Sequence, residues 1–273
     1  MEYGRIQFVD KPISRIVFGT AMPALFAATR SLHEGEADFP ARLQRAFALL
    51  DEMYALGVNC FDCSNHYGEE PLGEWMQSRG LREKCVILTK GAHHNRWRKR
   101  VTDFDILSDA HDSLAKLMTG KVEIYLLHRD DPELPVGPLM EALNQLKADD
   151  KIGAFGVSNW TVERIREANE YAYRHNLAPF TVSSPNFGLA EQVADPWGGG
   201  CVTISGPDNR AARAWYAQHH LPVFAYSTMA RGFFSGAFRS GEAEKADAVL
   251  DEAGRKGYAC PANFERLRRC EAL

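Results

Sequence analysis

Seven short apolar runs, each followed by a segment with helical periodicity, divide most of this sequence. The runs are rich in Val, Ile, Phe and Leu and alternate little between apolar and polar residues. Such runs are typical of parallel strands buried on both faces, and the regular strand–helix alternation indicates an α/β fold. The runs are SRIVFGTA (14–21), VNCFDCS (58–64), CVILTKG (85–91), VEIYLLHR (122–129), IGAFGVSN (152–159), FTVSSPN (180–186) and LPVFAYST (221–228).

The segments between the runs carry the start and stop signals of helices. Apolar residues recur at helical spacing over 43–54, and Gly57 follows as the expected C-terminal cap. The next helix is expected to begin at Thr102, where T-D-F-D offers a capping box with Asp in place of the usual Glu. A further helix is expected over 139–146, and the C-terminal NFERLRRCEAL suits a helix capped by Asn263.

Two architectures fit this alternation, an open doubly wound sheet and a closed (β/α)8 TIM barrel. An open nucleotide-binding sheet usually carries G-x-G-x-x-G after its first strand, whereas this chain has FGTAMPALF there. Polar residues instead follow many strands, as in a barrel whose active site gathers residues from all the loops of one face. We therefore expect a single TIM-barrel domain over residues 1–273. The polar residues are Thr20, Asp62, Lys90, His128, Ser158, Asn159, Ser184 and Ser227.

Composition disfavours several classes of partner. The net charge of -4 gives no general attraction to nucleic acid or to anionic lipid. No run of about 18 uncharged apolar residues predicts a membrane span, and the N-terminus lacks the pattern of a secretory signal. We expect a cytoplasmic protein that binds neither nucleic acid nor membrane. The basic stretch HHNRWRKR (93–100) is short and isolated, so it fits a solvated or cofactor-flanking loop.

The cysteines do not predict a metal site. Cys60 and Cys63 have the spacing of a metal or redox pair, but in a strand this odd offset directs the two side chains to opposite faces. No second C-x-x-C pair completes a zinc site. We expect free thiols and no bound metal.

Four residues suggest proton chemistry at the strand ends. Asp62, Lys90 and His128 end successive strands, and Tyr67 lies in the loop after Asp62. Neighbouring strands are about 4.8 Å apart, so such side chains can converge. A buried lysine keeps its charge beside an anion such as Asp62, and its ammonium group lowers the pKa of a nearby phenol. A single Asp or Lys at a strand end is more often a cap or a solvated residue, and a single His more often bonds a backbone group, but the set predicts Tyr67 as an acid usable near neutral pH.

The segment GVNCFDCSNHYGEEPLGEW (57–75) resembles the signature of the aldo-keto reductase family. The resemblance continues in order through ILTKG, EIYLLHRDD, IGAFGVSNW and VFAYSTMARGFFSG, and it covers the chain from about Ser14 to Leu273. It implies an oxidoreductase that reduces an aldehyde or ketone with NADPH, with NADH left open. It also implies roles for four residues: Tyr67 as general acid, Asp62 and Lys90 as its tuning pair, and His128 as the residue that orients the substrate carbonyl.

The same resemblance implies a set of cofactor contacts. Ser158 and Asn159 match the pair that binds the nicotinamide carboxamide, and Tyr226 matches the aromatic residue that stacks on the ring. Ser184 stands where the family usually has Gln, either as a departure or because the alignment there is shifted by one residue. The remaining positions are Gly19 and Thr20 at the first strand end, Asp62, and Ser227, Met229, Arg231 and Gly232 in the loop that follows the pyrophosphate.

The C-terminal region departs from a complete barrel. A barrel of this kind needs eight strands, and the pattern shows seven, so we expect the eighth strand and the C-terminal segment to be missing from this chain. This leaves open a second function, a non-catalytic nicotinamide-binding sensor or regulatory subunit of the same fold. A barrel hydrolase with paired carboxylates is less favoured, because Asp62 has Lys90 as its expected partner. The sequence leaves the carbonyl substrate and the oligomeric state open.

Overall fold

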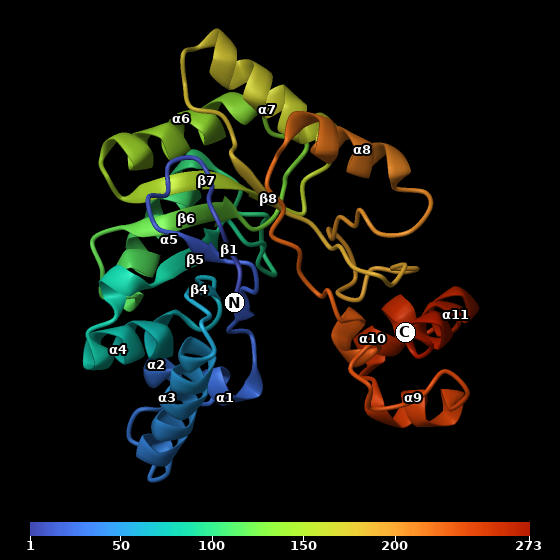
Figure 1. The fold of residues 1–273 in the computed structure, drawn as a ribbon. Coiled ribbons are helices and arrows are strands. Elements are labelled where there is room, and N and C mark those ends of the chain that lie inside the picture. The colour runs from blue at the N-terminus through green and yellow to red at the C-terminus, as the bar shows by residue number, and fades with distance from the viewer. The chain divides into compact units, whose positions relative to one another are not determined.

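A computed structural model describes residues 1–273 of the chain (Figure 1). The chain forms two compact units. The first unit comprises Met1–Val157 and Arg166–Val182, and the second comprises Ser158–Ile165 and Ser183–Leu273. No helix combines the length and the apolar character that crossing a lipid bilayer requires.

The first unit is built on a parallel sheet whose strands follow one another in chain order. The order is β3-β4-β5-β6-β7-β8, and the last residues of β7 and β8 belong to the second unit. Gly19 lies opposite Asp62 and Lys90 opposite Leu126 in parallel pairs. This is the strand order of a barrel, so the predicted α/β fold of the barrel class is confirmed. The strands are β3 (Phe18–Gly19), β4 (Cys60–Asp62), β5 (Val86–Gly91), β6 (Val122–Leu127), β7 (Ile152–Ser158) and β8 (Val182–Ser184).

Apolar side chains bury the centre of this sheet. Every residue of β5 is buried, and β6 is buried except at Glu123. Gly156 allows the chain to approach Val182 closely, because a Cβ atom at Gly156 would lie 1.9 Å from the carbonyl oxygen of Val182. The central strands are therefore buried on both faces, as their nearly continuous apolar sequences predict.

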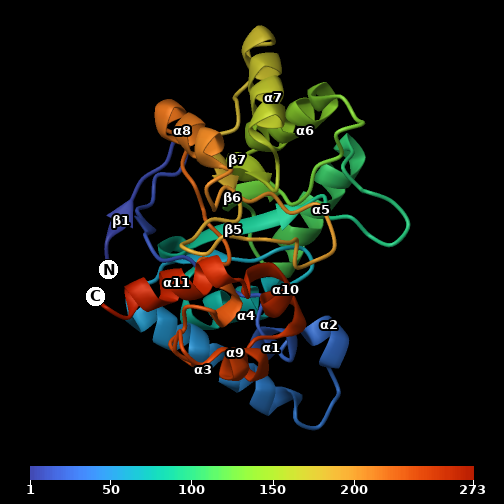
Figure 2. The same ribbon diagram turned by 90° about the vertical axis from the view of Figure 1, so that its right-hand side faces the viewer.

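The helices of the first unit lie around the outside of these strands (Figures 1 and 2). The helices expected over 43–54, from Thr102 and over 139–146 are confirmed as parts of α3, α5 and α6. The Thr102 hydroxyl accepts a hydrogen bond from the backbone N–H of Asp105 at 3.2 Å, as the predicted cap requires. The elements are β1 (Tyr3–Gly4), β2 (Ile13–Ser14), α1 (Pro23–Phe26), α2 (Arg30–His33), α3 (Phe39–Ala55), α4 (Glu69–Arg79), η1 (Arg82–Lys84), α5 (Asp103–Lys116) and α6 (Val136–Ala148), with α7 (Val162–Arg174) divided between the units.

The second unit has its own small apolar core among short helices, which appear in red in Figure 2. The Phe233 ring packs against the rings of Phe238 and Phe264, with centroids 5.3 and 5.1 Å apart. Leu250, Tyr258 and Leu267 complete the buried cluster. The elements are α8 (Arg210–His219), η2 (Ala230–Gly232), α9 (Ala243–Val249), α10 (Glu252–Tyr258) and α11 (Pro261–Cys270).

Two details of the sequence prediction are wrong in this unit. Residues 221–228 form isolated bridges and no strand. Ser183 exchanges backbone hydrogen bonds with Pro222 and Phe224, but Pro185, two residues further on, has no N–H group with which to continue the ladder. Asn263 does not cap the last helix, which begins at Pro261, a residue well suited to a first helical turn. The fully buried Asn263 side chain instead bonds the backbone N–H and carbonyl oxygen of Glu191, at 2.9 and 2.8 Å.

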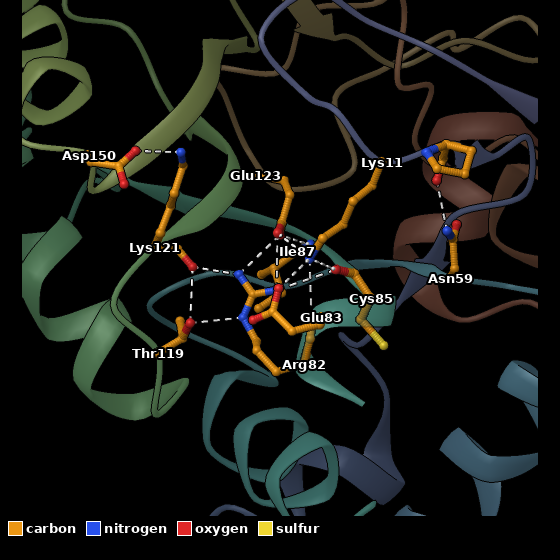
Figure 3. A network of polar contacts seen from close by, with 11 residues as sticks. Lys11, Asn59, Arg82, Glu83, Cys85, Ile87, Thr119, Lys121, Glu123 and Asp150 are labelled. Atoms are coloured by element: carbon orange, nitrogen blue, oxygen red, sulfur yellow. Dashed lines mark hydrogen bonds and ion pairs between the residues drawn. The ribbon is translucent and has the colours of Figure 1, made fainter. Parts of the chain in front are cut away.

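A network of polar side chains lies at the N-terminal ends of the strands in the first unit. Figure 3 shows Lys11 and Arg82 converging on Glu123. Lys11 Nζ and Arg82 Nη1 donate to Glu123 Oε1 at 2.8 and 3.0 Å, and the backbone N–H of Ile87 donates to Oε2 at 2.9 Å. Lys11, Arg82 and Glu123 line a cleft of about 520 Å³. Because both cations are already paired with Glu123, this end of the sheet serves stability, and a reactive site is expected at the opposite end.

We predict that Glu123→Gln lowers the free energy of unfolding by about 2–3 kcal/mol, because it leaves two partly buried cations facing an amide. Glu123 is 12% exposed at its side chain. Glu83→Gln is the matched control, since Glu83 also faces Lys11, at 4.0 Å, but is 92% exposed. The free energy of unfolding of Glu83→Gln is expected to differ from that of the unaltered protein by no more than about 0.5 kcal/mol. Urea unfolding of the three proteins measures both values, and equal effects would contradict the prediction.

Candidate active site

The C-terminal ends of β4 and β5 place a carboxylate and an ammonium group together. Asp62 is the last residue of β4, and Lys90 lies near the end of the adjacent β5. Lys90 Nζ forms an ion pair with Asp62 Oδ1 and donates to the carbonyl oxygen of Cys63 at 3.1 Å. Lys90 is 4% exposed at its side chain, and Asp62 is 20% exposed. The predicted pairing of these two residues is therefore present in the structure.

The loop after β4 brings Tyr67 to this pair. Reciprocal backbone hydrogen bonds of 3.0 and 2.8 Å between Ser64 and Tyr67 fold the loop into a turn. Gly68 follows with φ +76°, and a Cβ atom there would lie 1.8 Å from Thr20 Oγ1. Lys90 Nζ donates to Tyr67 Oη at 3.0 Å, and Tyr67 Oη lies 3.4 Å from Asp62 Oδ1. The phenol, the ammonium group and the carboxylate thus form one hydrogen-bonded group.

The electrostatics of this group differ in one respect from the sequence prediction. Burial alone would lower the pKa of Lys90, but the charges of Asp62 and Tyr67 outweigh it and raise that pKa above its usual value. The pKa of Tyr67 is also raised, first by burial and then by Asp62, and this outweighs the opposing effect of Lys90. Lys90 acts on the pKa of Tyr67 in the expected direction, but the expected net lowering is wrong, because burial and then the charge of Asp62 oppose it more strongly.

His128 follows β6 and lies beside Tyr67, with ring centroids 6.2 Å apart. Its Nδ1 is 3.2 Å from the Ser64 hydroxyl, which fixes the orientation of the ring. Burial and then the charge of Lys90 hold the pKa of His128 well below its usual value, so the imidazole is neutral at pH 7. His128 thus joins the group in the position that the strand pattern predicts.

Two further histidines, which the sequence reasoning missed, contact this group. The His93 ring lies 4.7 Å from that of His128 and 4.4 Å from that of His66, at interplanar angles of 75° and 78°. The available signal was the occurrence of histidine in two loops after neighbouring strands, in SNHYG and in GAHHN. The second of these lies in the stretch HHNRWRKR, whose positive charge favours its interpretation as a basic loop.

The cations of that loop are opposed by carboxylates of the first unit. Arg98 Nη2 donates to Asp105 at 2.6 Å, and Lys99 Nζ donates to Asp131 at 2.6 Å. Arg100 is paired with Asp109. Arg96 lies over the exposed ring of Trp97, 4.2 Å from its centroid. Most of the positive charge in residues 93–100 is thus balanced locally.

The first strand end meets Asp62 through its backbone. The backbone N–H and hydroxyl of Thr20 donate to the carbonyl oxygen of Asp62 at 2.8 and 2.9 Å. Gly19 precedes it in β3, and nothing lies within 4 Å of the position of a Cβ atom at Gly19. Thr20 therefore braces the strand that carries Asp62.

In the second unit, four of the predicted cofactor residues lie together. Tyr226 Oη donates to Asn159 Oδ1 at 2.7 Å, and Asn159 Nδ2 donates to Ser158 Oγ at 3.1 Å. Ser158 Oγ in turn donates to the carbonyl oxygen of Ser184 at 2.9 Å. Asn159 adopts a left-handed backbone, with φ +61°, which asparagine tolerates better than most residues. The amide and hydroxyl groups supply both donors and acceptors, which is the chemistry that a carboxamide requires.

The loop after this group is held by its own ion pair. Arg231 is paired with Asp251, and its Nε donates to that carboxylate at 3.2 Å. Ser227 and Arg231 have left-handed φ values of 51° and 53°, and Gly232 has φ +97°. Met229 is 52% exposed. The structure therefore places these predicted residues in one tight turn, with the Arg231 charge opposed.

Comparisons with known proteins match this sequence to one protein family. The family model for the aldo/keto reductase family matches residues 29–273. The chain is 35% identical over 173 residues to norsolorinic acid reductase B of Aspergillus parasiticus, covering 58% of this chain and 45% of that protein. It is 31% identical over 158 residues to the aryl-alcohol dehydrogenase [NADP(+)] of Phanerodontia chrysosporium, covering 51% of this chain and 40% of that protein.

A solved structure agrees with this placement at the level of the fold. The glycerol dehydrogenase of Gluconobacter oxydans superposes with a TM-score of 0.69 at 22% identity, covering 97% of this chain and 74% of that one. The chain spans about half the length of the curated relatives it matches. Because the family model covers residues 29–273, which is most of the sequence, this chain belongs to the aldo/keto reductase family.

Proposed function

We propose that this chain carries the catalytic site of an NADPH-dependent oxidoreductase that reduces an aldehyde or ketone to an alcohol. The observation that carries the proposal is the hydrogen bond of 3.0 Å from Lys90 Nζ to Tyr67 Oη. Tyr67 Oη accepts this hydrogen bond and donates to Asp62 Oδ1 at 3.4 Å, and in the proposed reaction it exchanges this long contact for a hydrogen bond to the substrate oxygen. Family membership supports the same reaction class.

In this proposal Tyr67 is the general acid. When bound, a reduced nicotinamide supplies the hydride to the carbonyl carbon. Negative charge then develops on the carbonyl oxygen, and Tyr67 transfers its proton to that oxygen. The raised pKa of Tyr67 is compatible with this step, because an alkoxide is a much stronger base than a phenolate. The phenolate that remains is stabilised by the Lys90 ammonium group, which Asp62 holds in place.

His128 is proposed to orient the substrate carbonyl. A neutral imidazole can donate a hydrogen bond to that oxygen without competing as a proton source. The contact between Ser64 Oγ and His128 Nδ1 fixes the orientation of the ring, and the lowered pKa of His128 keeps the ring uncharged.

The residues of the second unit are proposed to bind the nicotinamide. Ser158 and Asn159 offer the donors and acceptors of a carboxamide partner, and Tyr226 offers a ring face. Preference for NADPH over NADH rests on the resemblance and on the NADP(+) in the name of one relative. The names of relatives also refer to aryl alcohols, so the carbonyl compounds assayed should include aromatic ones.

We predict that Tyr67→Phe lowers kcat for reduction at least about 100-fold, because the variant has no proton to donate. Steady-state oxidation of NADPH with a panel of aldehydes measures the effect. Tyr173→Phe is the matched control, since Tyr173 is 65% exposed, and its rate is expected to equal that of the unaltered protein. An unchanged rate in Tyr67→Phe would refute the assignment. NADPH binding with no turnover by the unaltered protein would favour the sensor alternative.

The pH dependence of kcat/KM tests the protonation state of Tyr67. Because its pKa is raised above the usual value of about 10, Tyr67 keeps its proton throughout the neutral and mildly alkaline range. We predict no decline of kcat/KM for reduction between about pH 7 and 10 from loss of this proton. A decline with an apparent pKa below about 9 would contradict the prediction and indicate that Lys90 dominates.

Substitutions of Tyr226 can separate two contributions to cofactor binding, the contact with its aromatic ring and the hydrogen bond made by its hydroxyl group. We predict that Tyr226→Leu weakens NADPH binding by about 2- to 10-fold through loss of the aromatic face. Tyr226→Phe keeps the face, loses the hydrogen bond to Asn159 Oδ1, and is expected to bind more tightly than Tyr226→Leu. Fluorescence titration with NADPH measures the three dissociation constants. Equal affinities in all three proteins would remove Tyr226 from the cofactor site.

A further inference from the structure

We propose that a buried contact behind the candidate site sets the distance between the Tyr67 phenol and the Lys90 ammonium group. The inference rests on the proposed function, because it concerns the geometry of the same proton donor. The contact joins three positioning residues, Glu69, Thr89 and Lys116, which act through the backbone and take no part in proton transfer.

A hydrogen bond between Glu69 and Thr89 joins the two chain segments that carry the phenol and the ammonium group. Glu69 follows Tyr67 by two residues, at the start of α4, and Thr89 immediately precedes Lys90 in β5. Thr89 Oγ1 donates to Glu69 Oε1 at 2.5 Å, and both side chains are buried. Successive side chains of a strand point to opposite faces, so this bond and the bond from Lys90 Nζ to Tyr67 Oη lie on opposite faces of β5. The two segments are therefore connected twice, once through the reacting side chains and once behind them.

Lys116, the last residue of α5, connects the same contact to the loop that presents Tyr67. Its Nζ donates to the carbonyl oxygen of Asn65 at 3.0 Å and lies 3.8 Å from Glu69 Oε2. The backbone N–H of Asn65 in turn donates to the carbonyl oxygen of Lys90 at 3.0 Å. One ammonium group thus bridges the loop before Tyr67 and the helix that begins after it.

The close approach of α4 to the end of α5 makes this bridge possible. Gly73 lies one turn after Glu69 in α4, and a Cβ atom at Gly73 would lie 2.7 Å from the carbonyl oxygen of Lys116. A larger residue at this position would therefore push the end of α5 away from α4. Glu69 and Lys116 meet because glycine lets the two helices approach to within this distance.

Helix α4 does not need a buried acid at its start. Glu70, the next residue, also lies in the first turn, where a negative charge is favourable, and it is only partly buried. Glu69 is instead 2% exposed. Burial raises its pKa, and the hydrogen bonds from Ser113 and Thr89 and the charge of Lys116 act in the opposite direction. A carboxyl group buried to this extent is costly without such partners, so its place suits the contact rather than the helix terminus.

Steady-state kinetics with NADPH and a panel of aldehydes tests the bond between Glu69 and Thr89. We expect Thr89→Val to lower kcat about 10- to 100-fold, because a small displacement of the proton donor slows transfer. Thr89→Ser keeps the hydroxyl group and is expected to retain most of the rate. Each kcat is expressed per NADPH-binding site, counted by fluorescence titration. A merely structural role would lower the number of sites and leave kcat per site unchanged, and that result, or an equal loss in both variants, would overturn the inference.

Lys116→Met tests the loop contact in a variant that tolerates the change even if Thr89→Val does not fold. The Lys116 side chain is 36% exposed. We expect kcat per site to fall about 3- to 10-fold, because the carbonyl oxygen of Asn65 loses its ammonium partner. Lys121→Met is the matched control, since Lys121 also loses an ion pair, with Asp150, and is 46% exposed. Its rate is expected to equal that of the unaltered protein, and equal losses in the two lysine variants would contradict the role of Lys116.

Hydrogen exchange without cofactor separates this inference from the proposed reaction. The backbone N–H groups of Asn65 and Tyr67 donate to the carbonyl oxygens of Lys90 and Ser64, at 3.0 and 2.8 Å, so their exchange reports on the loop. NMR is expected to show about 3- to 10-fold faster exchange at both amides in Lys116→Met, with the amides of β6 unchanged. That result would support the positioning role even if no reductase activity were found. Unchanged exchange at these two amides, or equal acceleration throughout the protein, would overturn it, whatever the activity.

Discussion

The ion pair between Lys90 and Asp62 is the interaction on which the candidate site depends. An ammonium group with 4% exposure is costly unless an anion is adjacent, and Asp62 supplies that anion from the neighbouring strand. A lysine has three N–H donors, and here they meet Asp62, the Cys63 carbonyl oxygen and Tyr67 Oη. Because each donor has a partner, the lysine holds the phenol oxygen in one orientation. Tyr67 Oη in turn donates to Asp62 Oδ1 at 3.4 Å, so the phenol is both an acceptor and a donor within the ion-paired group.

The backbone holds this arrangement before any ligand arrives. The Thr20 side chain bonds the Asp62 carbonyl oxygen, and the same side chain leaves no room for a Cβ atom at Gly68. Gly68 is needed there for two reasons, its positive φ and its approach to Thr20. The short loop that presents Tyr67 is thus fixed at one end by the ion-paired strand and at the other by this contact. Such preorganisation is what a proton donor needs to act within a narrow geometry.

The fold and the four central residues could be predicted from the sequence because each depends on local pattern. Buried parallel strands require apolar runs, and Asp62, Lys90 and His128 stand at their ends. The sign of the Tyr67 pKa shift could not be predicted, since it depends on the balance of burial, Asp62 and Lys90 at known distances. The role of Asn263 was also inaccessible, because its partner Glu191 lies 72 residues away in the sequence. The His66–His93 contact depends on the path of two loops, which periodicity does not specify.

The two ends of the same strands carry polar networks of opposite character. At the N-terminal ends, the Glu123 carboxylate accepts hydrogen bonds from two cations and a backbone N–H, so its charge is balanced there. At the C-terminal ends, the ion pair of Lys90 and Asp62 stands beside the His128 imidazole, which burial and then the charge of Lys90 keep neutral. The proton affinity of Tyr67 is raised first by burial and then by Asp62, against the opposing effect of Lys90. The same sheet thus holds a carboxylate paired with two cations at one end and, at the other, an ion pair that contacts a phenol.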